Sequence, residues 1–199
     1  HWWRRFRSMD WGYNDPCCVL WHAADGEGRV FTYRELYVRQ TLAGDVARRA
    51  VELSRGENIA YTVASPDMWQ KRGAVLSAKG ETLAELFAAA GMPLTPADNS
   101  RIAGWNCLRE YLAPRFETEK NGKQPMWQCF GTCENLIRQL PLLQYDKCNC
   151  EDAADGNDHA PEALRYGLMS RPRRSQQPIV KKARAYDPLS VPERASGWL

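Results

Sequence analysis

The alternation of hydrophobic and polar residues over the first 40 positions predicts three β-strands. The expected strands cover residues 4–10, 17–23 and 30–38, and the third is rich in aromatic and branched residues. Connections dense in Gly, Asp, Asn and Pro separate the three runs, which is typical of tight turns. Together these runs predict an antiparallel meander.

Helical spacing of apolar residues replaces this alternation farther along the chain. It predicts helices at about 42–53, 83–90, 102–112, 136–140 and 158–169. We expect Thr41 to cap the first of these helices, and Asn99 or Ser100 to cap the third. A continuous apolar run at 59–64 predicts a short strand buried on both faces of a sheet, and we expect another short strand at 127–130.

This order of elements predicts a mixed α/β fold, in which an antiparallel meander is followed by parallel strands with helices on both sides of the sheet. We expect residues 1–170 to form this unit, and residues 171–199 to be a basic, flexible C-terminal tail. No apolar run approaches the roughly 18 residues of a membrane span. No leader peptide is recognisable, and because the chain starts at His1 we expect it to be cut from a longer protein.

Charge is distributed unevenly along the 199 residues, although the formal net charge is only +3. The expected tail holds seven arginine and lysine residues against two acids, a net charge of +5, which leaves a net charge of −2 for residues 1–170. The tail can be read as a solvated linker or as a phosphate-binding arm, and charge alone favours neither.

The seven cysteines are odd in number, and two of them are adjacent, which argues against a regular disulfide framework. We therefore expect a reducing, cytosolic compartment. Cys129 and Cys133 together with Cys148 and Cys150 offer a zinc site as an alternative. A Cys-x-Cys pair is a cramped zinc clamp, so buried free thiols are the favoured interpretation.

Carboxylates occur where predicted strands and helices end. Asp10 closes the first strand, Asp67 follows the apolar strand, and Asp158 and Glu162 flank His159 at the start of the last helix. Strand ends are where open α/β sheets build their sites. Carboxylates brought together repel one another without a cation, so the pattern suggests a Mg²⁺ or Mn²⁺ site. Each acid also has a simpler interpretation as a turn or cap residue.

Four short stretches add a resemblance to this pattern. They are Asp-Trp-Gly-Tyr at 10–13, Val-Ala-Ser-Pro-Asp-Met-Trp at 63–69, Ala-Asp-Asn-Ser-Arg-Ile-Ala-Gly-Trp at 97–105 and Asp-His-Ala-Pro-Glu-Ala-Leu-Arg-Tyr at 158–166. In this order they resemble the nuclease domain of the large terminase subunit of tailed bacteriophages and prophages, over about residues 4–170. The resemblance implies a ribonuclease H-like fold and a metal-dependent endonuclease that cuts concatemeric viral DNA during genome packaging.

The same resemblance implies site residues and two bound ions, Mg²⁺ or Mn²⁺. Asp10 matches an aspartate that bridges both ions, and Asp67 matches the aspartate after the central strand. Glu162 stands where the family usually has Asp, which makes Asp158 a rival for the third ligand. His159 would lie beside the ions or near the leaving group. Glu35 is a weaker acidic candidate.

Further expectations concern the substrate and the partners. A site of carboxylates repels DNA unless basic side chains hold the backbone, and the candidates are Arg101, Lys71, Arg72 and Arg165. The resemblance implies double-stranded DNA as substrate, with a small terminase subunit and a portal protein as partners in the cytoplasm of the host bacterium. It also implies that the family's ATPase domain would precede this chain, which is consistent with the absence of an ATP-binding phosphate loop.

Two other functions remain open. The chain could be another nuclease of the same fold, such as a junction resolvase or a ribonuclease. It could also be a non-catalytic module that docks on DNA or on the portal, with its acids serving only as caps and turns.

Overall fold

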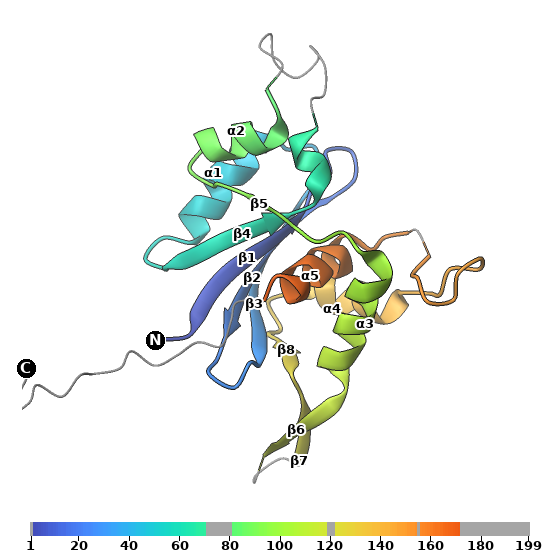
Figure 1. Ribbon diagram of the computed structural model, residues 1–199. Coiled ribbons are helices and arrows are strands. Elements are labelled where there is room, and N and C mark those ends of the chain that lie inside the picture. Colours follow the sequence, from blue (N-terminus) through green and yellow to red (C-terminus); the bar gives the residue numbers. More distant parts are fainter. Residues whose placement is uncertain (1, 71–80, 119–121, 155, 172–199) are drawn as a thin grey trace, which may run out of the picture.

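A six-stranded mixed sheet forms the centre of the computed structural model, which describes residues 2–70, 81–118, 122–154 and 156–171 (Figure 1). The strands follow the spatial order β5-β4-β1-β2-β3-β8. In chain order they are β1 (Arg4–Asp10), β2 (Cys17–Ala24), β3 (Val30–Val38), β4 (Ile59–Ala64), β5 (Thr95–Pro96) and β8 (Trp127–Cys129). Strands β1 to β3 form the predicted antiparallel meander, and β4, β5 and β8 join it in parallel pairings.

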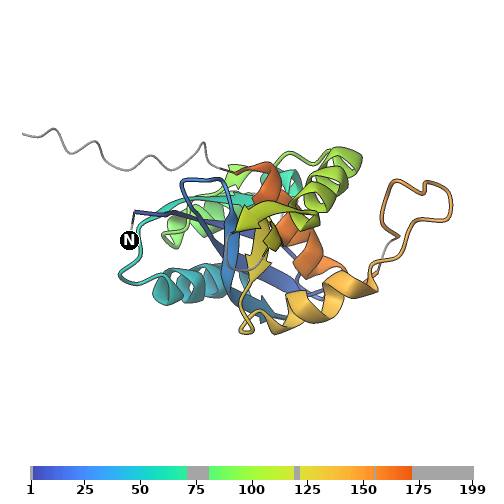
Figure 2. The ribbon, with the colours of Figure 1, turned by 90° about the horizontal axis from the view of Figure 1, so that it is seen from below.

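Helices cover both faces of this sheet, as predicted. The helices are α1 (Ala43–Leu53), α2 (Leu83–Ala89), α3 (Arg101–Leu112), α4 (Glu134–Gln139) and α5 (His159–Met169), with short 3₁₀ turns η1 (Pro66–Trp69) and η2 (Leu140–Leu142). Helices α1 and α2 lie on one face, and α3, α4 and α5 lie on the other (Figures 1 and 2). The sheet therefore separates two hydrophobic cores.

The alternation of side chains along β1 and β2 assigns residues to these two cores. Phe6 and Leu20 pack with α5, whereas Met9 and Trp21 pack with α1 and α2. Because side chains alternate along a strand, Asp10 lies on the same face of β1 as Phe6. The last residue of β1 is therefore directed toward the side of the sheet that α5 covers.

A glycine allows α5 to lie close against the sheet. A Cβ atom at Gly167 would stand 2.7 Å from Nε2 of His22 and 2.9 Å from the hydroxyl oxygen of Ser8. Ser8 and His22 are fully buried and bonded to each other over 2.7 Å, and the other ring nitrogen of His22 lies 2.9 Å from the hydroxyl of Thr32. This contact fixes the height of α5 above the sheet, and with it the position of its N-terminus.

Several local expectations were wrong. Leu42, not Thr41, is the N-cap of α1. Strand β4 is buried only in its C-terminal half, because β5 pairs with it only at Val63 and Ala64. One prediction of a cap was right: of the two candidates for α3, Ser100 is the N-cap. Its side chain, however, makes no capping hydrogen bond.

Strand β5 and a small hairpin, β6 (Pro114–Thr118) with β7 (Gly122–Pro125), were not predicted. The two residues of β5 are too few to show a pattern, and the hairpin is polar, with no alternation that marks one buried face. Among the described residues, no helix is long and apolar enough to cross a membrane. The expected tail beyond residue 171 lies outside the described residues, so the division into two parts stays a prediction.

Candidate active site

Asp10 and His159 meet where β1 ends and α5 begins. Nδ1 of His159 lies 3.0 Å from Oδ2 of Asp10, and the side chains of His159 and Asp10 are largely buried, with exposed fractions of 20% and 17%. This contact joins the sheet to the helix at the face that the side-chain alternation of β1 selects. It brings together two residues that the sequence analysis singled out from opposite ends of the chain.

Asp67 and Asp158 lie within electrostatic range of this pair. Burial raises the pKa of Asp10, and the negative charges of Asp158 and Asp67 raise it further, against the lowering effect of the hydrogen bond to His159. Asp67 stands in η1 directly after β4, the parallel neighbour of β1, so the two strands end side by side. The hydroxyl of Ser65 donates a hydrogen bond to the Asp67 carboxylate. The charges of Asp67 and Asp158 therefore act on Asp10 where β1 and β4 end, and these three residues are called the aspartate cluster.

Glu162 is nearby, but both of its carboxylate oxygens are bound by arginines. Oε1 accepts a hydrogen bond of 2.8 Å from Nη1 of Arg101, and Oε2 lies 2.7 Å from Nε and 2.6 Å from Nη2 of Arg165. Burial raises the pKa of Glu162, and the charges of Arg165 and Arg101 act to lower it. Metal binding by Glu162 stays a prediction, since an ion would have to compete with two guanidinium groups.

Arg165 does not face solvent. Its side chain is fully buried beneath α3, where a Cβ atom at Gly104 would come within 2.7 Å of it. Its guanidinium also lies over the rings of Trp105 and Tyr166. Its Nη2 also donates to the side-chain oxygen of Asn99 at 3.0 Å. Arg165 therefore holds Glu162 in place, and its burial removes it from the surface that DNA could contact.

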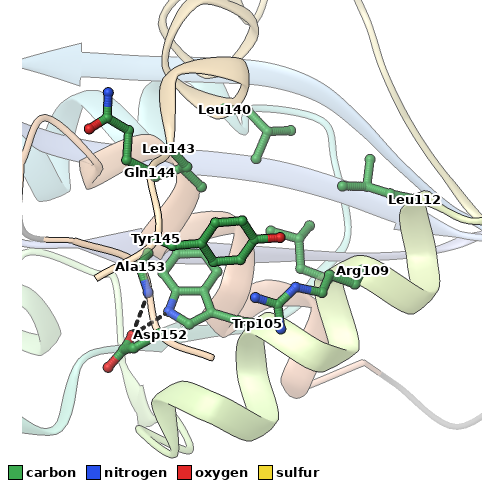
Figure 3. Close-up of a pocket in the computed structure, with 10 residues that line it drawn as sticks. Trp105, Arg109, Leu112, Leu140, Leu143, Gln144, Tyr145, Asp152 and Ala153 are labelled. Atoms are coloured by element: carbon green, nitrogen blue, oxygen red, sulfur yellow. Dashed lines mark hydrogen bonds between the residues drawn. The ribbon is translucent and has the colours of Figure 1, made fainter. Parts of the chain in front are cut away.

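Arg101 connects Glu162 to the segment that follows η2. Its Nε donates to both oxygens of Asp152, at 3.0 and 3.1 Å, and the indole nitrogen of Trp105 donates to Asp152 at 2.9 Å. A pocket of about 210 Å³ lies beside this junction, between α3 and residues 140–153 (Figure 3). Figure 3 shows Trp105 and Tyr145 in its wall, and none of the three gathered aspartates lines it. The pocket is therefore separate from the carboxylate cluster.

Glu35 has a structural role. Its carboxylate accepts hydrogen bonds from the backbone nitrogens of Asn135 and Leu136, at 3.0 and 2.8 Å, and from the Asn135 side chain at 2.7 Å. The two backbone nitrogens belong to the first turn of α4, where N–H groups have no acceptor within the helix itself. A strand residue thus caps a helix that has no side-chain cap of its own.

The donor atoms of the aspartate cluster suit a divalent cation in their chemistry. Carboxylate oxygens are the ligands of Mg²⁺ and Mn²⁺. Burial raises the pKa of Asp10, and so do the negative charges of Asp158 and Asp67, a repulsion that a cation would relieve. As the side chains stand, no group of three or more His, Cys, Asp or Glu residues in the described part of the chain is arranged to hold a metal ion. The zinc alternative gains no support from this result, and all seven cysteines are free.

The remaining candidates could not all be placed. Lys71 and Arg72 lie outside the described residues. Sequence reasoning missed Asp152, Ser65 and Asn99 as partners of the site, because an acid or amide in a polar loop carries no signal of the arginine or carboxylate that it will meet.

Comparison with solved structures shows which proteins share this architecture. The chain is similar to the nuclease domain of the P22 large terminase, with a TM-score of 0.64 and 22% identity, over 85% of this chain and 81% of that one. It is also similar to the large terminase nuclease of the thermophilic phage G20c with bound magnesium, with a TM-score of 0.56, 16% identity and coverage of 84% and 82%. A form of the G20c nuclease with bound cobalt matches with a TM-score of 0.53.

A third match is a longer protein, the large terminase of another thermophilic bacteriophage. The TM-score is 0.62 at 14% identity, and the match covers 82% of this chain but only 38% of that one. No protein-family model and no curated protein sequence matches the chain. At these identities the similarity establishes the fold, and it confirms the predicted ribonuclease H-like architecture.

Proposed function

We propose that this chain is the nuclease part of a large terminase subunit, a metal-dependent endonuclease that cuts concatemeric viral DNA during genome packaging. The observation that carries the proposal is the contact of Asp10 with His159 at the carboxyl end of β1, with Asp67, after the parallel strand β4, and Asp158, at the N-cap of α5, acting on the charge of Asp10. Structural neighbours that are terminase nucleases, one with bound magnesium and one with bound cobalt, support it.

We assign a separate role in catalysis or DNA binding to each residue of the site. Asp10, at the end of β1, and Asp67, in η1 after β4, would hold two Mg²⁺ or Mn²⁺ ions, with Asp158 or Glu162 as third ligand. Bound there, the ions would supply the positive charge that a phosphodiester and an attacking water need in order to react. His159 orients the Asp10 carboxylate through its hydrogen bond to Oδ2. Arg101, which is one-third exposed, would contact the DNA backbone from the adjoining helix.

The similarity to the longer large terminase suggests partners for this chain. Because the match spans 38% of that large terminase, we propose that an ATPase domain acts together with this unit. Double-stranded DNA would be the substrate, with a small subunit and a portal protein as partners.

Plasmid cleavage tests the proposal directly. Supercoiled DNA is incubated with the protein in Mn²⁺, in Mg²⁺ and in EDTA, using wild type, Asp67→Asn and the control Asp45→Asn. Asp45 is an exposed acid on α1, on the opposite face of the sheet. We expect wild type and Asp45→Asn to cut in either metal and not in EDTA, and Asp67→Asn to be inactive.

Other outcomes would favour the other functions. Cutting of branched DNA or RNA–DNA hybrids in preference to linear duplex would indicate a junction resolvase or a ribonuclease. DNA or portal binding that is indifferent to EDTA and to Asp67→Asn, without cleavage, would indicate a docking module.

A further inference from the structure

A second concave site lies on the face of the sheet opposite to the aspartate cluster. It is a cavity of about 810 Å³ between the C-terminal end of α1, the first half of β4 and the residues that follow α2. Its lining includes three arginines, Arg7, Arg48 and Arg55. The alternation along β1 directs Arg7 away from the face that carries Asp10, so this cavity is independent of the proposed nuclease site.

Arg7 is held rigidly at the wall of the cavity. Its side chain comes from the middle of β1, and the residue is only 6% exposed. Nε donates to the hydroxyl of Thr62 at 2.9 Å, and Nη1 donates to the hydroxyl of Ser54 at 3.1 Å and to the carbonyl oxygen of Ala50 at 3.4 Å. Neutral groups on β4 and α1 therefore fix the plane of the guanidinium.

The second terminal nitrogen of Arg7 is left for a ligand. Within the described part of the chain, Nη2 has no hydrogen-bond partner and no carboxylate forms an ion pair with Arg7. Among the described residues, the only side-chain nitrogen or oxygen that is both fully buried and without a hydrogen-bond partner is Nη1 of Arg165. Nη2 of Arg7 is not among such buried atoms, so solvent reaches it, and Arg7 lines the cavity.

The other charges around the cavity leave an excess of positive charge. Glu57 forms an ion pair of 2.8 Å with Arg34, and Arg48 forms an ion pair with Asp45 on the same helix. Arg55 is exposed and has no ion pair with any described residue. Glu52 and Glu57 are the two acids that line the cavity with the three arginines, and the charge of Glu57 also acts on Arg7. Burial lowers the pKa of Arg7 to about 10, so the group still carries its charge at neutral pH.

We propose that this cavity binds a phosphate group, with Nη2 of Arg7 donating to its oxygens and Arg55 adding charge at the rim. A guanidinium with two free N–H groups suits a tetrahedral oxyanion, and charge-assisted bonds of this kind are strong where water is partly excluded. The volume has room for more than a free ion. The phosphate could belong to a free nucleotide or to a DNA backbone, two sources that the affinities for dAMP and for duplex would distinguish.

A purely structural role for Arg7 makes a different prediction. Arg7 also stabilises the end of α1, because Ala50 lies in its last turns and the helix has no basic residue of its own there. That role uses only Nη1. If it were the whole explanation, phosphate would leave the Arg7 side chain undisturbed.

The decisive experiment observes Arg7 in the wild-type protein, in EDTA so that the aspartate cluster binds no metal. The Nε–Hε signals of the arginines are followed by NMR while inorganic phosphate, dAMP or a short DNA duplex is added. We expect the Arg7 signal to shift and saturate with inorganic phosphate. Tighter binding of dAMP than of duplex would identify a free nucleotide as the source, and the reverse would identify a DNA backbone.

Variants check that the shift reports on the cavity. Arg55→Gln, at an exposed position, should weaken phosphate binding on the order of tenfold, and Glu52→Gln should strengthen it. Arg138→Gln, an exposed arginine on α4, should change nothing. Arg7→Lys, which keeps the charge but loses Nη2, should bind more weakly if it folds. An Arg7 signal that does not move, or equal binding by Arg55→Gln and Arg138→Gln, would overturn the proposal.

Discussion

The ring of His159 and the carboxylate of Asp10 are joined over 3.0 Å, although the two residues are 149 positions apart in the sequence. The contact locks the first turn of α5 to the last residue of β1. It also places a titratable ring beside the carboxylate at the centre of the proposed nuclease site.

This pair should make His159 titrate above its ordinary range. The hydrogen bond with Asp10 raises the pKa of His159, and partial burial opposes it. A raised folded-state pKa means that the pair stabilises the fold below the ordinary His pKa of about 6.5, and that this stabilisation is lost as the pH rises through the raised value. In Asp10→Asn we expect the pKa of His159 to fall, measured by NMR titration of the ring in EDTA.

His22 provides an internal control for that titration. It is fully buried, and burial lowers its pKa to about 3, so its ring should stay neutral across the same pH range. An unchanged His159 titration in Asp10→Asn would mean that the hydrogen bond does not govern the ring.

Glu162 should contribute strongly to the stability of the fold. Glu162→Gln would leave the fully buried Arg165 without a carboxylate, and breaking one partner of a buried pair costs about 3 kcal/mol or more. We expect urea denaturation to show this loss for Glu162→Gln, and none for Glu110→Gln, an exposed glutamate on α3. If Glu162→Gln kept its stability but lost cleavage, Glu162 would be a metal ligand instead.

Glu35→Gln should destabilise the protein by about 1 kcal/mol, the usual cost of a lost helix cap, while metal-dependent cleavage persists. The reason is that the Glu35 carboxylate accepts hydrogen bonds from Asn135 and Leu136 at the start of α4. Thermal unfolding and plasmid cleavage measured on the same sample separate the two effects. Loss of cleavage with unchanged stability would restore Glu35 as a fourth acid of the site.

Gly167→Ala should lift α5 from the sheet, because the added methyl group would stand 2.7 Å from the buried ring of His22. We expect a loss of about 1–3 kcal/mol in the free energy of unfolding, as for other overpacked cores. Gly131→Ala is the matched control, since nothing lies within 4 Å of its Cβ position. Equal stability of the two variants would show that α5 can shift without cost.

The sequence predicted the elements whose pattern is strong within one segment. Strands β1 to β4 and helices α1 and α3 fall where alternation or helical spacing places them, within one or two residues. It also indicated the candidate site residues Asp10, Asp67, Asp158 and His159, because each stands at the end or the start of an element that the sequence pattern predicts. The hairpin of β6 and β7 and the two-residue β5 escaped, since short or polar strands carry no periodic signal.

What the sequence could not determine is which partner each charge meets. Glu162 and Asp158 looked alike as candidate ligands, and both act electrostatically on Asp10, but the fold pairs Glu162 with Arg101 and the buried Arg165. Arg7 and Arg165 are both arginines in amphipathic segments, yet Arg165 binds a carboxylate and Arg7 opens to a cavity. The physical reason is that patterning depends on near neighbours along the chain, whereas charge pairing depends on distances that only the packed tertiary structure sets.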